Sequence, residues 1–191
     1  MLAGRQYGTL PRYHMSDDGE KWEAAQEGAE LLRDGDADAS IRELERVIDL
    51  DERNEYAFFF LGAAHFEKGA FDKALKAYLK ALEIAPKYLG AMVSVGHALR
   101  MLGRHQESIR MARQILQLAP DDGDALYLLG LAHYARGERA AATEYLQRFL
   151  GTRPEVEVAN EVQGLLQVLI GDVQPAEEEP SNQGGRDPSL N

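Results

Sequence analysis

Hydrophobic positions along the chain recur at the spacing of α-helices, and the helical segments alternate with short breaks. From residue 55 to 68 the apolar side chains follow a helical period, and a second such segment runs from residue 71 to 85. Gly69 separates the two segments, and glycine commonly ends a helix. Pro86 follows the second segment and cannot donate the next helical hydrogen bond. This stretch predicts two consecutive helices joined by a tight turn.

These two segments are one unit of an internal repeat with a period of 34 residues. Three series of residues keep this step: Gly28, Gly62, Gly96, Gly130 and Gly164; Gly35, Gly69, Gly103, Gly137 and Gly171; and Pro86, Pro120 and Pro154. With the first glycine set at position 8, the repeats span 21–54, 55–88, 89–122 and 123–156. The period predicts an all-α protein built from stacked helix pairs.

The first glycine series falls in the middle of predicted helices, where glycine is less favourable than alanine by about 1 kcal/mol. Recurrence at one position of every repeat indicates a packing requirement. We expect the helix backbone to cross its partner so closely there that a Cβ atom would hold the two apart.

A half repeat follows at residues 157–171. In a full repeat, three positions of the first helix pack on the second, as Leu126 and Leu129 do in the fourth repeat. The half repeat carries polar residues at these positions: Asn160, Gln163 and Gln167. We therefore expect a capping helix that no second helix follows.

The two ends of the chain lack the repeat pattern. Residues 172–191 contain three consecutive glutamates, prolines and glycines but almost no apolar bulk, which predicts a disordered acidic tail. Residues 1–20 predict a flexible N-terminal arm. The repeats and the cap together predict a single domain over residues 21–171.

The second repeat carries a pattern that identifies a family. It has a Leu-Gly pair, two alanines, an aromatic residue and a final proline: Leu61, Gly62, Ala74, Tyr78, Ala81 and Pro86. In this spacing the chain resembles the tetratricopeptide repeat family over residues 21–171. The resemblance implies an α-solenoid of antiparallel helix pairs in a right-handed superhelix, with the first helices lining a concave groove.

The net charge and the hydropathy of the chain argue against nucleic acid as a partner and against insertion into a membrane. The 191 residues include 21 Lys and Arg against 32 Asp and Glu, a formal net charge of -11. This charge opposes the counterion release that nucleic-acid binders use, so nucleic acid is not an expected partner. The longest apolar run, residues 56–64, is far shorter than the roughly 20 residues of a membrane helix, and the chain begins without the apolar stretch of a secretory signal. We expect a cytoplasmic protein with no membrane insertion.

Catalytic and metal-binding patterns are missing from the sequence. It contains no cysteine, which excludes thiolate nucleophiles and cysteine-ligated metals. No two of the five histidines combine the i, i+4 spacing of a helical metal site with a third ligand nearby. The glycines of the two series are explained by the repeat period, and no phosphate-binding glycine motif is present. The sequence predicts a protein that is not an enzyme and takes no cofactor or metal.

In the second to fourth repeats, the first helix carries apolar residues on the side that faces away from its second helix. A side that met only water would be polar. Positions 2, 5, 9, 12 and 13 lie opposite the positions that pack on the second helix. In the second to fourth repeats this side is rich in aromatic and apolar residues and also carries an imidazole and a guanidinium. We expect a peptide-binding groove formed by Tyr56, Phe59, Ala63, Phe66, His97, Arg100, Met101, Tyr127, Leu131 and Tyr134.

Aromatic and arginine side chains are typical of binding hot spots, and this set suits a segment with apolar anchors and an acidic group facing Arg100. A structural alternative is that Tyr56 and Phe59 fill space between neighbouring first helices. Members of the family that clamp a free carboxyl terminus use Lys and Asn in the groove, and this chain lacks that clamp. The corresponding positions hold Ala25, Ala29, Phe59 and Ala63.

The sequence as a whole predicts a non-catalytic adaptor that holds an apolar or aromatic peptide or helix segment of another protein. The alternative is a chaperone of the tetratricopeptide type for a secreted or assembly-bound subunit. A homo-oligomer is also compatible with an aromatic groove. Met15 offers an alternative start, and if residues 1–14 are native, Leu10 and Tyr13 could fill the groove as a self-ligand. The partner, the pathway and any regulatory role of the tail are left open.

Overall fold

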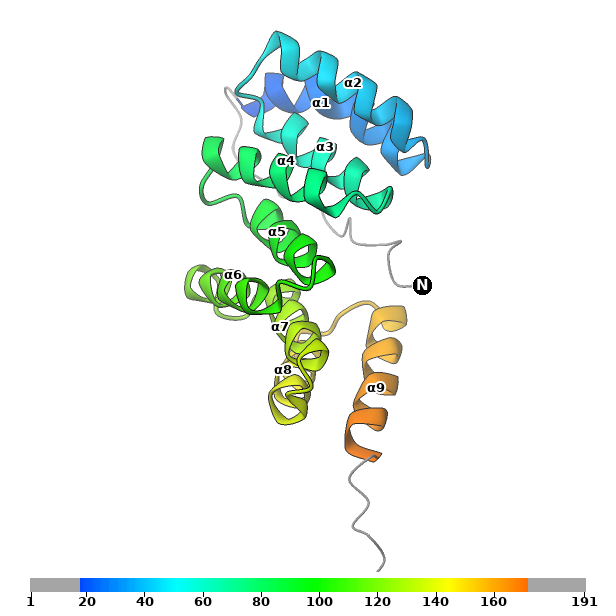
Figure 1. The fold of residues 1–191 in the computed structure, drawn as a ribbon, viewed down its shortest axis with the longest axis vertical. Coiled ribbons are helices and arrows are strands. Elements are labelled where there is room, and N and C mark those ends of the chain that lie inside the picture. The colour runs from blue at the N-terminus through cyan, green and yellow to red at the C-terminus, as the bar shows by residue number, and fades with distance from the viewer. Residues whose placement is uncertain (1–17, 172–191) are drawn as a thin grey trace, which may run out of the picture.

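The computed structural model describes residues 18–171, and these form nine α-helices (Figure 1). In chain order they are α1 Asp18–Arg33, α2 Ala37–Leu50, α3 Glu55–Glu67, α4 Phe71–Ile84, α5 Leu89–Met101, α6 His105–Leu118, α7 Gly123–Ala135, α8 Arg139–Gly151 and α9 Val156–Gly171. The prediction of an all-α solenoid built from helix pairs is confirmed. Helices α3 and α4 begin at the residues that the apolar period indicated.

The helices stack in one direction, from α1 and α2 at one end to α8 and α9 at the other (Figure 1). Each helix packs on the next, and the first helices of successive full repeats, α1, α3, α5 and α7, also contact one another. The apolar core is a row of clusters. One cluster joins α3, α4 and α5 around Tyr78 and Val95, and another joins α7, α8 and α9 around Leu146 and Leu166.

The turns inside the helix pairs place glycine at positive φ. Gly69 has a φ of +71°, a conformation that residues with a Cβ atom rarely adopt. Its amide donates to the carbonyl of Phe66 at 2.9 Å, and the amide of Ala70 donates to the carbonyl of His65 at 2.9 Å. These bonds satisfy the last carbonyls of α3 and turn the chain into α4.

The glycine at position 8 mainly faces a large side chain, and at Gly130 the backbone of the partner helix also comes close, with the Leu146 nitrogen 3.4 Å from an added Cβ atom. A Cβ atom on Gly62 would lie 2.6 Å from a ring carbon of Tyr78 in α4. A Cβ on Gly130 would lie 2.5 Å from a methyl carbon of Leu146 in α8. The missing side chain therefore leaves a notch that a large residue of the second helix fills.

In the third repeat, a residue of the following repeat fills the notch. The third repeat's own second helix offers only Ala112 at the corresponding position, and Leu128 of α7 packs against Gly96 instead. In the cap, a Cβ on Gly164 would meet nothing within 4 Å. The polar residues Asn160, Gln163 and Gln167 of α9 are exposed to solvent.

The predicted ends can be compared only in part. Helix α1 begins at Asp18, so the last three residues assigned to the arm are helical. The rest of the arm, with Leu10 and Tyr13, lies outside the described residues, as does the predicted tail at 172–191. Between residues 18 and 171, no helix combines the length and the apolar character needed to cross a bilayer.

Candidate functional site

The ten predicted groove residues lie on α3, α5 and α7, and eight of them keep contact with solvent. The most accessible are Met101 and Tyr134, with exposed fractions of 41% and 44%. The other six are half-buried. We call these eight residues the first-helix surface: Tyr56, Phe59, Phe66, Arg100, Met101, Tyr127, Leu131 and Tyr134.

Ala63 and His97 belong to the interior, which corrects their assignment to the groove. Ala63 has no exposed surface, and His97 exposes 2%. Both stand at position 9 of their repeats, where one first helix contacts the next. Burial, with a smaller contribution from the charge of Arg100, lowers the pKa of His97 to about 3, so this imidazole is neutral at neutral pH.

At the α1 end, Tyr56 and Phe59 belong to a cluster of packed aromatic rings. Tyr56 lies 5.5 Å from Trp22 and 5.9 Å from Tyr88, measured between ring centroids. Phe59 lies 5.0 Å from Tyr88 and 5.2 Å from Phe60. This geometry agrees with the structural alternative for Tyr56 and Phe59. The sequence analysis missed Tyr88 because it lies in the turn before α5, outside both helical periods.

Arg100 lies on α5 and is the one positively charged side chain among the eight residues of the first-helix surface. The side chain is half-buried, and its Nε atom is enclosed without a hydrogen-bond partner. Burial lowers the pKa of this guanidinium, while the neighbouring Tyr127 of α7 acts in the opposite direction. The Tyr127 ring packs on Phe149 with centroids 5.0 Å apart, which holds Tyr127 in place.

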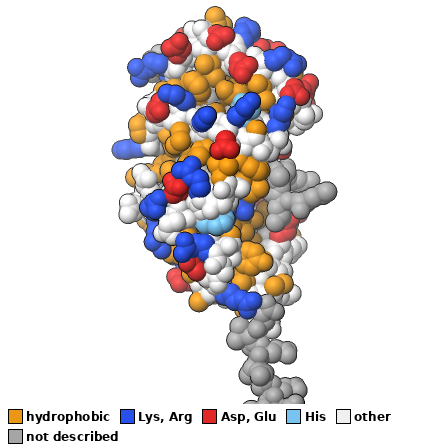
Figure 2. Space-filling model, viewed as in Figure 1, with side chains coloured by type: hydrophobic (Ala, Val, Ile, Leu, Met, Phe, Trp, Pro, Cys, Tyr) orange, Lys and Arg blue, Asp and Glu red, His pale blue; other side chains and the backbone are white. Residues whose placement is uncertain are grey.

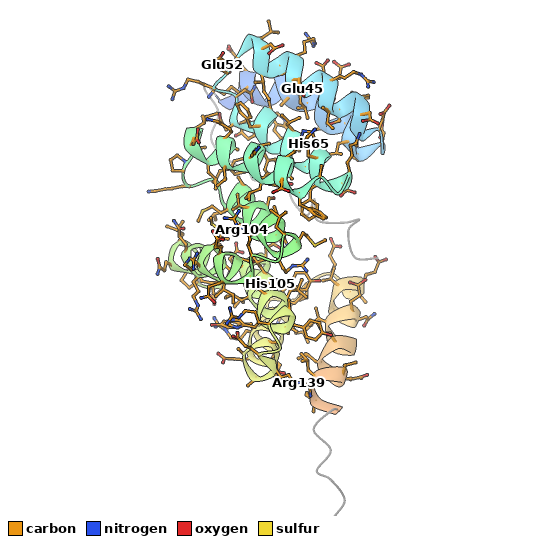
Figure 3. All side chains as sticks on the ribbon, viewed as in Figure 1. Glu45, Glu52, His65, Arg104, His105 and Arg139 are labelled. Carbon is orange, nitrogen blue, oxygen red and sulfur yellow. The ribbon has the colours of Figure 1, made fainter. Side chains whose placement is uncertain are left out.

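A cavity of about 330 Å³ lies between the fourth repeat and the cap. It is lined by Tyr134, Ala135, Gly137, Arg139, Val168 and Leu169. The cavity exists because the backbone of α9 approaches α8 but not α7. Figure 3 places Arg139 at the start of α8, beside the end of α9. Val168 is 56% exposed. Nothing in the sequence pattern indicated this role for Val168, because the polar residues of the predicted cap lie on a different side of α9.

A second hollow, of about 370 Å³, lies between α4, α5 and α6. Its apolar walls include Leu75 and Leu79, and Arg104 and Glu107 lie at its edge. In Figure 2 hydrophobic, basic and acidic side chains alternate over this face. Two hydrogen bonds of 2.7 Å join Arg104 to Glu107, so these charges satisfy each other. The first-helix surface is the better candidate because its cation is not paired in this way.

Chemistry beyond binding finds little support in the part of the chain that the structure describes. No group of three His, Asp or Glu residues there could hold a metal ion. His133 is buried, its ring stacks on Tyr145 with centroids 5.4 Å apart, and its Nδ1 atom is hydrogen-bonded to Glu138. This imidazole therefore serves packing in the fourth repeat.

Comparison with known proteins agrees with this arrangement. A sequence model of the tetratricopeptide repeat matches residues 26–88 and 96–157. The chain belongs to the tetratricopeptide repeat family. DnaJ homolog subfamily C member 7 from Homo sapiens is 30% identical over 145 residues, which cover 70% of this chain and 29% of that protein. The chain spans less than a third of the length of the first curated relatives that it matches.

Two solved tetratricopeptide repeat structures share the fold. MamA from Desulfovibrio magneticus RS-1, from residue 41 to its end, has a TM-score of 0.66 at 21% identity, covering 83% of this chain and 89% of that one. The second repeat domain of human RPAP3, in complex with an HSP70 peptide, has a TM-score of 0.56 at 20% identity. That alignment covers 60% of this chain and 97% of the RPAP3 domain.

Tetratricopeptide repeat proteins are generally non-catalytic scaffolds for interactions between proteins, and membership of the family supports that role here. The four positions that correspond to the free-carboxylate clamp contribute apolar packing. Ala25 and Ala63 are fully buried, and Phe59 belongs to the aromatic cluster. The first-helix surface therefore differs from that clamp in its chemistry.

Proposed function

We propose that this protein is an adaptor whose first-helix surface holds an apolar or aromatic segment of another protein. The observation that carries the proposal is a pair of large hydrophobic side chains left accessible at one cavity. Tyr134 and Val168 line the cavity, and Met101 on α5 is exposed as well. Accessible apolar groups beside a concavity are typical of binding sites.

The cavity offers a place where an apolar side chain of the partner can be buried. An apolar side chain of the partner would enter between Tyr134 on α7 and Val168 on α9 and would shield both from water. Each Å² of apolar surface removed from water contributes about 25 cal/mol. The Tyr134 ring offers a large contact area at small cost in rotamer entropy. The neighbouring Leu131 would extend the contact along α7.

A peptide selection tests the proposal and does not require an identified partner. Random peptides displayed on phage are selected on the full chain, and the affinities of the enriched peptides are measured by calorimetry. We expect the enriched peptides to share apolar or aromatic residues. Replacing Tyr134→Ala together with Val168→Ser should weaken binding about tenfold or more.

The matched control is Leu118→Ser, which removes a half-exposed leucine from the second helix α6. We expect this variant to bind the peptides as the original chain does. Equal binding by the Tyr134/Val168 variant, with an unchanged helical circular dichroism spectrum, would contradict the proposed site.

The chaperone alternative stays a prediction of the sequence. It requires that the protein keep an otherwise insoluble partner in solution until that partner is transferred. An adaptor instead remains in the final complex. Co-expression with a partner identified from the selected peptides separates the two roles, because only a chaperone would increase the soluble yield of the partner.

A further inference from the structure

Arg100 differs from three arginines of the described residues that each pair with a nearby carboxylate. Arg46 pairs with Glu43, Arg104 with Glu107, and Arg136 with Glu138, and all three of these arginines reach solvent. Arg100 is more enclosed, yet its buried Nε atom has no hydrogen-bond partner within the described residues 18–171. An enclosed charge without a partner is unfavourable, so this site favours an incoming anion.

The groups around Arg100 leave its positive charge in place. His97 stands one turn earlier on α5 and is neutral at neutral pH. Tyr127 approaches from α7, and its pKa is raised by burial and by Glu161 of α9 but lowered by Arg100. The phenol stays protonated at neutral pH and keeps its hydroxyl as a hydrogen-bond donor, and its ring lies 6.4 Å from that of His97, measured between centroids.

We propose that Arg100, assisted by the Tyr127 hydroxyl, binds the carboxylate of one Asp or Glu side chain within the apolar segment of the partner. This inference rests on the proposed function. The planar guanidinium can hold a carboxylate with two parallel hydrogen bonds, which are stronger than neutral ones. The net charge of -11 repels acidic runs, so a single acidic residue among apolar neighbours fits best.

Isosteric peptides test the assignment. The strongest peptide from the selection is made with both termini capped, in versions that carry Glu or Gln at each position in turn. We expect one position at which Glu binds about tenfold to a hundredfold more tightly than Gln, as expected for hydrogen bonds to a charged group. In Arg100→Gln this preference should disappear. Tyr127→Phe should reduce it while binding of the Gln peptide is unchanged.

The matched control is Arg46→Gln, which removes an exposed arginine of α2 and should keep the full preference. Equal binding of the Glu and Gln peptides at every position overturns the inference, and so does a preference that survives in Arg100→Gln. If these peptides still lose affinity in Tyr134→Ala, the proposed function stands and only the acidic contact fails. If no apolar peptide binds, both proposals fail.

The acidic tail of the chain is the competing source of a carboxylate. A full-length variant carrying Glu177→Gln, Glu178→Gln and Glu179→Gln should bind the Glu peptide as the original chain does. A gain in affinity for the Glu peptide, absent when Arg100→Gln is added, would assign the site to the tail and overturn its assignment to a partner.

Discussion

The second and third repeats share a glycine framework but complete it in different ways. In the second, Tyr78 of its own α4 fills the notch at Gly62, and Phe59 on the outer side of α3 packs on the Tyr88 ring. In the third, Leu128 of the next repeat fills the notch at Gly96, and Arg100 stays without a carboxylate. The two repeats thus share one glycine position, but a side chain of the same repeat fills the notch in the second and a side chain of the next repeat fills it in the third.

Leu128→Ala should have the largest effect on this comparison. Leu128 is fully buried and joins repeats 3 and 4, so its truncation leaves a cavity at Gly96. We expect the free energy of unfolding to fall by about 2–5 kcal/mol in guanidinium titrations. Leu118→Ala, at an exposed position of α6, should change it little. A loss below about 1 kcal/mol for Leu128→Ala would show that the third repeat does not depend on its neighbour.

Acidification should weaken the third repeat through His97. The folded protein holds this imidazole neutral down to about pH 3, whereas an unfolded histidine accepts a proton below pH 6.5. The unfolded state therefore binds more protons in this window, and stability falls as the pH drops. Between pH 7 and pH 5 the original chain should lose about 2 kcal/mol more than His97→Leu. Parallel pH profiles for the two proteins would refute this.

Gly62→Ala should destabilise the second repeat by a smaller amount. The new methyl group would meet the Tyr78 ring, which is 4% exposed and has little room to move. Overpacking of this kind costs about 1–3 kcal/mol, and the better helix propensity of alanine offsets about 1 kcal/mol of that. Urea titration measures the difference. An increase in stability would mean that Tyr78 can leave the notch freely.

Gly164→Ala is the matched substitution in the cap and should have the smallest effect, with the opposite sign. Nothing lies within 4 Å of the added methyl group, and α9 gains a better helix former. We expect the melting temperature to rise slightly, in line with a gain of up to about 1 kcal/mol. A clear decrease would indicate a contact of α9 beyond those described.

The sequence was sufficient for the helices and their order because glycine marks every repeat and proline ends three of the four. The sequence did not show that Ala63 and His97 are buried. A helical wheel distinguishes only the side that packs on the second helix from the opposite side, whereas a first helix in a solenoid also packs on the first helices of the repeats before and after it. For the same reason Tyr56 and Phe59 could not be divided between packing and binding. The cavity beside Val168 depends on how far α9 stands from α7, and no residue pattern of a single helix records that distance.

The limited backbone contact of α9 bears on how readily this helix opens. Because its backbone approaches only α8, the amide protons of α9 should exchange with solvent at a lower free energy than those of α7. A segment inserted between Tyr134 and Val168 would add a contact to the part of α9 that lines the cavity. Occupancy of the site would then be recorded as slower hydrogen exchange along the terminal helix, and the partner would act as the last layer of the stack.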